Sequence, residues 1–177
     1  MLGLRRGTVL LASHDATWAD EFRRTAEGIR TATGIPPGRI QHVGSTSVPD
    51  LPSKPILDID VGIIESDDIE EVAGCLARFG YVDRGDHDGG IGRLLVWETA
   101  AEVRTVHVHV IPHDSAWWRC DLAFRDALRA DAALRAKYAE LKTQLARRFA
   151  TDRRAYRHAK NDFFRQVLPS LGIETDD

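Results

Sequence analysis

Apolar residues in the first two thirds of the chain follow two spacings, one typical of helices and the other typical of strands. A large apolar side chain recurs every three or four positions after Asp15 and again over residues 66–80, which predicts two amphipathic helices. Short apolar runs between turn residues predict strands. The predicted strands cover residues 8–12, 40–43, 56–64, 81–82, 93–97 and 103–112, and the last two form a hairpin. Residues 83–92 are polar and glycine-rich, which predicts a loop.

The pattern changes after Pro112. Helical spacing then predicts three helices, over residues 121–129, 131–150 and 152–168, and only residues 173–177 are predicted to be disordered. Strands mixed with helices, followed by helices alone, favour an α+β fold. We therefore expect a mixed β-sheet core flanked by helices over residues 1–112, with a C-terminal helical part over residues 113–177 packed on that core.

The very apolar strand over residues 56–64 contains two carboxylates, Asp58 and Asp60. Successive side chains of a strand point to opposite sides, so these two acids lie on the same side. Neighbouring carboxylates in an apolar strand repel each other and are costly to bury unless a divalent cation lies between them. We interpret the pair as a metal site. The alternative is an edge strand with one face in water, which the apolar flanks disfavour.

A Gly-Ser turn lies twelve residues before this pair of acids. Gly44 allows the backbone to approach a phosphate, and the N–H groups that follow it can bind phosphate oxygens together with the Ser45 hydroxyl. Most Gly-Ser turns are only turns. The separation of this one from Asp58 and Asp60 makes phosphate binding the stronger interpretation.

Two histidines, His107 and His109, alternate on the strand over residues 105–111 and therefore share one side. Imidazole can act as a base near neutral pH, and it binds Zn²⁺ or Mn²⁺ better than Mg²⁺. One alternative is an ordinary polar strand face. Another is a histidine-triad hydrolase, in which three histidines alternate, but Thr105 takes the first of those places here.

The Gly-Ser turn and the Asp-x-Asp strand together resemble the nucleotidyltransferase superfamily. The segments QHVGSTSVP (residues 41–49) and KPILDIDV (residues 54–61) are similar to the GrpB family within that superfamily, and the resemblance covers nearly the whole chain. The same kind of domain is found fused to dephospho-coenzyme A kinases. Asp50 departs from the GrpB pattern, which has glycine at this place. Further segments that match the family are His14-Asp15 with Trp18, the strand of His107 and His109, Phe124-Arg125-Asp126 with Leu128-Arg129, Tyr138 with Lys142, and Tyr156 with Lys160.

The resemblance implies a nucleotidyltransferase-like fold and metal-dependent transfer of a nucleotidyl group from a nucleoside triphosphate to an acceptor, either a small molecule or a protein. Asp58, Asp60 and His109 are expected to bind a divalent metal, Mg²⁺ or Mn²⁺, with Zn²⁺ as an alternative because of the histidines. The superfamily usually carries a third carboxylate on a later strand. His107 and His109 would take that place as ligand or base, so all four side chains should converge on one pocket. The alternative is a non-catalytic module that binds a nucleotide or a partner protein.

Several residues are candidates for nucleotide binding because they surround the turn or carry positive charge at helical spacing. They are Gly44, Ser45, Thr46, Lys54, Arg93, Arg125, Lys142 and Lys160. A cation four residues from a tyrosine could hold a triphosphate and a base. Alternatively, the tyrosine packs in the core and the cation extends to solvent.

Charge and composition narrow the class of protein further. The net charge of −3 argues against general nucleic-acid binding. Residues 1–118 carry a net charge of −7 and residues 119–165 a net charge of +7, which suits a metal and a polyphosphate held between them or two solvated surfaces.

No apolar run approaches the ~20 residues of a membrane span or the ~7–15 of a secretory signal. With two cysteines that we interpret as reduced thiols, Cys75 and Cys120, we expect a cytoplasmic protein. The acidic loop Asp86-His87-Asp88 could bind a metal, but a solvated turn is the preferred interpretation.

Overall fold

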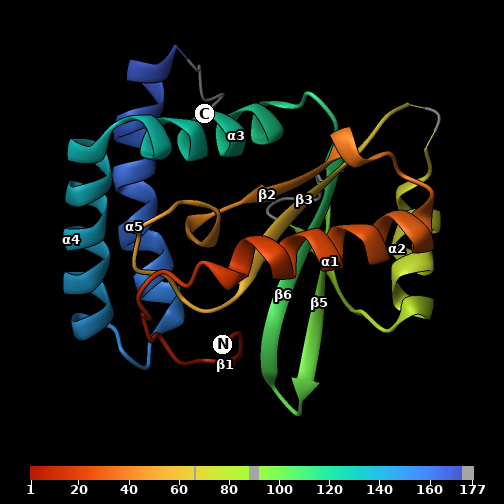
Figure 1. The fold of residues 1–177 in the computed structure, drawn as a ribbon, viewed down its shortest axis with the longest axis horizontal. Coiled ribbons are helices and arrows are strands. Elements are labelled where there is room, and N and C mark those ends of the chain that lie inside the picture. The colour runs from red at the N-terminus through yellow and green to blue at the C-terminus, as the bar shows by residue number, and fades with distance from the viewer. Residues whose placement is uncertain (66, 88–91, 173–177) are drawn as a thin grey trace.

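A mixed β-sheet forms the centre of the fold (Figure 1). The structure, a computed structural model, describes residues 1–65, 67–87 and 92–172, and within these ranges the sheet has six strands in the order β2-β3-β6-β5-β4, with β1 paired to β6. Of the pairs described, β3 and β6 run parallel and the others antiparallel. The strands are β1 (Leu4–Arg5), β2 (Ile40–Val43), β3 (Leu57–Ile63), β4 (Val82–His87), β5 (Gly92–Ala100) and β6 (Val103–Pro112).

Five helices surround the described part of the sheet: α1 (Thr17–Thr33), α2 (Ile69–Phe79), α3 (Ala116–Ala130), α4 (Ala132–Arg148) and α5 (Arg153–Val167). Short 3₁₀ turns are η1 (Pro37–Arg39), η2 (Ser45–Ser47) and η3 (Leu168–Leu171). Four helices begin where a side chain accepts first-turn N–H groups, which satisfies donors that a helix leaves without partners. These caps are Asp68, Ser115, Asp131 and Asp152. Among the described residues no helix is long and apolar enough to cross a membrane.

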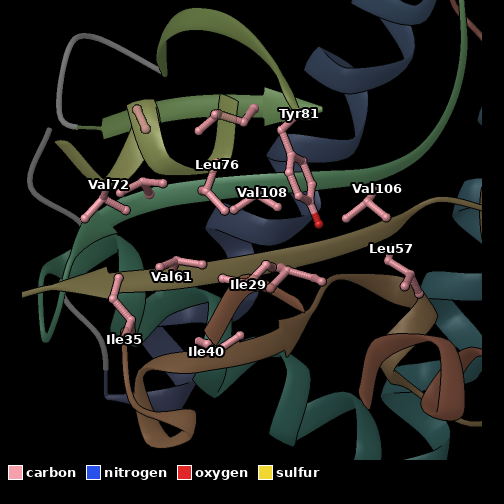
Figure 2. Close-up of a cluster of buried hydrophobic side chains, with 14 of the residues drawn as sticks. Ile29, Ile35, Ile40, Leu57, Val61, Val72, Leu76, Tyr81, Val106 and Val108 are labelled. Atoms are coloured by element: carbon pink, nitrogen blue, oxygen red, sulfur yellow. The ribbon is translucent and has the colours of Figure 1, made fainter. Parts of the chain in front are cut away.

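Strand alternation gives the sheet an apolar face and a polar face. Ile59 of β3 and Val108 of β6 are fully buried in a core completed by Ile29 of α1 and Leu76 of α2. Figure 2 shows Ile29, Leu76 and Val108 of this core. The intervening residues of β3 and β6 point to the other face and carry the acids and histidines, so the core packing fixes which side chains meet there.

The C-terminal helices form a second core with the loop after η2. Val48 and Leu51 of this loop pack with Phe124 of α3 and Tyr138 of α4. Helix α3 also contacts β2 and β6, while α4 and α5 lie side by side at the left of Figure 1. The α+β fold with a mixed sheet is therefore confirmed. The division of the chain at residue 112 stays a prediction.

Three local predictions were wrong. Residues 8–12 form no strand apart from an isolated bridge between Ala12 and Ser53, because Val9 packs against the C-terminal helices instead. Residues 82–87 form the strand β4 rather than a loop. This strand lies at the end of the sheet and has a bulge between Asp83 and Asp86, which explains its polar sequence. Helix α3 begins at Ala116, five residues before the predicted start. The predicted disorder of residues 173–177 and the end of the 86–88 motif lie outside the described residues.

Candidate metal and nucleotide site

Four polar side chains from two neighbouring parallel strands form the centre of the candidate site. The register of β3 and β6 pairs Asp58 with His107 and Asp60 with His109. Nδ1 of His107 is 3.0 Å from Oδ1 of Asp58, and Nδ1 of His109 is 3.1 Å from Oδ1 of Asp60. The structure thus brings together the four side chains that the sequence analysis expected to converge. Their roles in catalysis and metal binding stay predictions.

A third carboxylate reaches this cluster from helix α3. Asp121 offers an oxygen within 4.8 Å of a donor atom of Asp60 and of His109. This residue was not predicted from the sequence, because the predicted helix began at Asp121, where an aspartate is an ordinary cap. With the helix starting at Ala116, Asp121 lies in its second turn and faces the sheet. Its four-residue spacing from Arg125 on one helix face is the signal that could have revealed it.

The first acid–histidine pair consists of a charged carboxylate and a neutral imidazole. Burial raises the pKa of Asp58, but the hydrogen bond from His107 and the charges of His109 and Lys54 outweigh this and lower it. Burial lowers the pKa of His107 more than Asp58 raises it. The hydrogen bond assigns the ring proton of His107 to Nδ1, so Nε2 presents a lone pair.

The imidazole of the second pair behaves in the opposite way to His107, because more acids surround it. Burial lowers the pKa of His109, but the hydrogen bond and charge of Asp60, with the charges of Asp58 and Asp121, raise it to about 9. Burial, followed by repulsion from Asp60, raises the pKa of Asp121 to about 8. Asp121 therefore holds a proton near neutral pH, and a bound cation would favour its charged form.

The Gly-Ser turn lies directly against the first acid. Gly44 has φ +65° and ψ −172°, a conformation that only glycine adopts without strain. A Cβ atom at Gly44 would lie 2.6 Å from Oδ2 of Asp58. Beneath the turn, the buried Thr46 hydroxyl is 3.0 Å from Nε2 of His42, whose ring stacks on Phe22. Thr46 thus supports the turn from inside, whereas Ser45, which follows Gly44, is partly exposed.

Positive side chains approach the carboxylates from the loop before β3 and from helix α5. Lys54, Arg153 and Lys160 each interact electrostatically with Asp58. Burial and the charges of Arg153 and Lys160 lower the pKa of Lys54 to about 7. Tyr138 and, more weakly, the carboxylates raise the pKa of Lys160. Arg153 was not predicted from the sequence, although its seven-residue spacing from Lys160 places both on one face of α5.

The structure keeps two of the predicted nucleotide ligands away from the carboxylates. Arg93 lies on the opposite face of the sheet, because its partner in β6 is Val110, and it pairs with Glu70 and Asp83. Lys142 is only 2% exposed and donates to the carbonyl of Pro52, so it anchors a loop. For these two residues the prediction of a nucleotide contact was wrong.

Arg125 lies beside the cluster, but its guanidinium is engaged. It donates to Oε1 of Gln41 and to the carbonyl of His42, each at 3.1 Å, and pairs with Asp126. One turn further along α3, Arg129 donates to the carbonyl of Ser47 at 2.8 Å. The two arginines therefore hold helix α3 to both ends of the turn at Gly44. Arg125 therefore has a structural role, and its contact with a nucleotide stays a prediction.

The donor atoms of the cluster fit a divalent cation. Oδ2 of Asp60 and Nε2 of His107 are buried and have no hydrogen-bond partner among the described residues, and their side chains are 0% and 7% exposed. Buried polar atoms without partners are costly, and a cation beside Asp60 would satisfy Oδ2 of that residue. Asp58, His107 and His109 also have donor atoms within 4.8 Å of one another. A mixture of carboxylates and imidazoles suits Zn²⁺ or Mn²⁺ better than Mg²⁺.

The architecture is that of nucleotidyltransferase-like proteins. The Cid1 poly(U) polymerase with MgGTP bound matches with a TM-score of 0.54 and 14% identity, over 77% of this chain and 44% of that one, which shows the fold alone. The conserved protein GrpB from Enterococcus faecalis matches with a TM-score of 0.71 and 26% identity, over 89% of this chain and 99% of that one.

The chain belongs to the GrpB family, because the family model described as GrpB protein matches residues 8–170. The glutamate-rich protein GrpB of Alkalihalophilus pseudofirmus is 30% identical over 97% of this chain and 100% of its own length. A dephospho-CoA kinase of Mycobacterium bovis is 28% identical over 91% of this chain but only 45% of its own length. The resemblance to GrpB and to kinase fusions is thereby confirmed.

Proposed function

We propose that this protein transfers a nucleotidyl group from a nucleoside triphosphate to an acceptor, with a divalent cation held by Asp58, Asp60 and His109. The observation that carries the proposal is the contact between the turn and the first acid. The backbone at Gly44 lies too close to Asp58 to carry a side chain. A phosphate bound to the N–H groups of the turn would therefore lie directly beside the carboxylate cluster. The nucleotidyltransferase-like fold supports this interpretation.

The phosphates would be bound by backbone and side-chain donors of the chain itself. The N–H groups after Gly44 and the hydroxyl of Ser45 can donate to phosphate oxygens. Lys54 and Lys160 supply positive charge on the side of α5, where they already interact with Asp58. These groups hold the triphosphate in one orientation, which is the main contribution a protein makes to phosphoryl and nucleotidyl transfer.

The acid–histidine cluster supports the chemistry of transfer. A divalent cation, when bound, supplies charge neutralisation at the triphosphate. The acceptor's nucleophilic atom forms a bond to the α-phosphorus while the bond to the bridging oxygen of the β-phosphate breaks, and pyrophosphate leaves. The neutral His107 can accept the acceptor's proton at Nε2, because Nδ1 donates to Asp58 and holds the ring in that orientation.

A second candidate function is a non-catalytic module that binds a nucleotide or a partner protein. This second candidate is favoured by the residues of β6. The strand carries His107 and His109 where the resemblance to the superfamily implies a carboxylate. The two candidate functions differ in whether pyrophosphate is released.

Release of pyrophosphate is therefore the test. We expect the wild type with Mn²⁺ and nucleoside triphosphates to release pyrophosphate slowly, with water as a substitute acceptor. Replacing both Asp58 and Asp60 by asparagine should lower the rate at least about 100-fold, equivalent to ~2.7 kcal/mol of transition-state stabilisation. Asp20→Asn, which removes an exposed charge on α1, is the matched control and should leave the rate unchanged.

Two results would contradict the proposal. If the double variant released pyrophosphate at the wild-type rate, the activity would not belong to this cluster. If the wild type bound triphosphate without releasing any pyrophosphate, the non-catalytic module would be the better account.

A further inference from the structure

A second group of three donors lies next to the pair formed by Asp58 and His107. Asp60 and His109 are register partners on β3 and β6, and Asp121 joins them from α3, with donor atoms of all three within 4.8 Å of one another. Three elements distant in sequence therefore meet at this point: strands β3 and β6 of the sheet and helix α3, the first helix of the C-terminal part. The transfer proposed above assigns no role to Asp121.

The buried acid in this group lacks a partner for one of its oxygens. Asp60 is 0% exposed, its Oδ1 accepts from His109, and its Oδ2 has no hydrogen-bond partner among the described residues. A fully buried carboxylate oxygen without a donor is costly. The second carboxylate, Asp121, approaches the same place and adds repulsion. A positive ligand at this point would remove both costs.

The donor types identify the class of ligand. Two carboxylate oxygens and one imidazole nitrogen form a set that Zn²⁺, Co²⁺ and Mn²⁺ accept readily, whereas Mg²⁺ prefers oxygen alone. Three protein ligands are fewer than the four of a closed structural zinc site, so a water or an anion would complete the coordination.

We infer that Asp60, His109 and Asp121 form a transition-metal site that takes Zn²⁺ or a related ion without nucleotide and fastens helix α3 to the sheet. The site shares Asp60 and His109 with the proposed transfer reaction, but its occupation requires neither triphosphate nor acceptor.

A metal that holds α3 against the sheet would also hold the turn at Gly44 in place. Arg125 and Arg129 follow Asp121 by one and two turns of the same helix, and they donate to the carbonyls of His42 and Ser47 on either side of the turn. A metal that fixes Asp121 against the sheet also fixes the helix from which both arginines extend. The metal thereby preorganises the phosphate-binding turn.

Metal titration of the stripped protein tests the site, with Co²⁺ as a spectroscopic substitute for Zn²⁺ and no nucleotide present. We expect the wild type to bind Co²⁺ with visible absorption bands, and an equal concentration of Mg²⁺ not to displace it. Asp121→Asn should weaken Co²⁺ binding by about tenfold or more, which corresponds to losing one charged ligand. Asp126→Asn removes the same charge from an exposed position of the same helix and should bind Co²⁺ as the wild type does.

A second measurement on the wild type avoids any dependence on the folding of a variant. Co²⁺ broadens NMR signals of nearby amides, and we expect the broadening to centre on residues 120–122 as well as on β3 and β6. Three results would each overturn the inference. Asp121→Asn could bind Co²⁺ with wild-type affinity, the wild type could bind no Co²⁺, or the broadening could be confined to residues 44–58. Because none of these measurements uses a nucleotide, a protein that binds Co²⁺ as expected but releases no pyrophosphate would contradict only the proposed function.

Discussion

Replacement of Gly44 by alanine is expected to lower both the stability of the protein and its affinity for a triphosphate. The backbone of Gly44 lies in a region essentially restricted to glycine, so an alanine there costs about 1–3 kcal/mol. The new Cβ would also lie 2.6 Å from Oδ2 and 3.0 Å from Cβ of Asp58, so the acid must move as a whole. We expect the melting temperature to fall by about 2–12 °C. Triphosphate binding in the presence of Mn²⁺ should weaken at the same time.

Gly38→Ala is the matched control for this substitution. A Cβ atom at Gly38 would meet no heavy atom within 4 Å, so this variant should melt and bind triphosphate as the wild type does. If Gly44→Ala behaved like Gly38→Ala in both thermal unfolding and triphosphate titration, the close contact between the turn and Asp58 would have no functional meaning.

Replacement of Lys142 by methionine is expected to flatten the dependence of the unfolding free energy on pH. Burial and the charges of Lys160 and Lys54 lower the pKa of Lys142 from an ordinary value of 10.5 to about 6. Between these values the unfolded chain binds one more proton than the native protein, so this residue makes stability rise with pH and fall as the pH drops towards 6. The wild type should therefore gain roughly 2.7 kcal/mol relative to Lys142→Met between pH 7 and pH 9.

Urea unfolding at several pH values measures this difference directly. Lys54, whose pKa is also lowered, is present in both proteins, so its contribution cancels when the two are compared. Lys137→Met, at an exposed position of the same helix, should unfold with the pH dependence of the wild type. Parallel curves for the wild type and Lys142→Met would show that the native protein keeps this lysine charged.

The acids and histidines of the cluster could be predicted from the sequence because strand alternation is a local property. In an apolar strand Asp58 and Asp60 must share a side, and the same holds for His107 and His109. That the two strands lie close together is not a local property, and this expectation came from the resemblance to a superfamily. Their parallel register is a finding of the structure. The turn at Gly44 was likewise predictable, because its backbone conformation is one that only glycine adopts without strain.

Which side chains of the C-terminal helices reach the cluster was harder to predict, because this depends on helix boundaries and on packing between distant segments. A start at Ala116 instead of Asp121 changes that acid from a cap into a member of the cluster. Lys142 and Arg93 are cations like Lys54 and Lys160, and only the tertiary structure distinguishes them, by enclosing Lys142 and placing Arg93 on the opposite face of the sheet. Residue type alone contains no such information.

The central claim is that Asp58 and Asp60 bind a cation together with a triphosphate, and a thermal-shift measurement tests it most directly. With Mn²⁺ and triphosphate at about 100 times the dissociation constant, the wild type should gain about 2.7 kcal/mol of stability. The double variant Asp58→Asn/Asp60→Asn, which relieves the repulsion between the acids, should stay folded and gain nothing. Equal stabilisation of the wild type and the double variant would contradict the account.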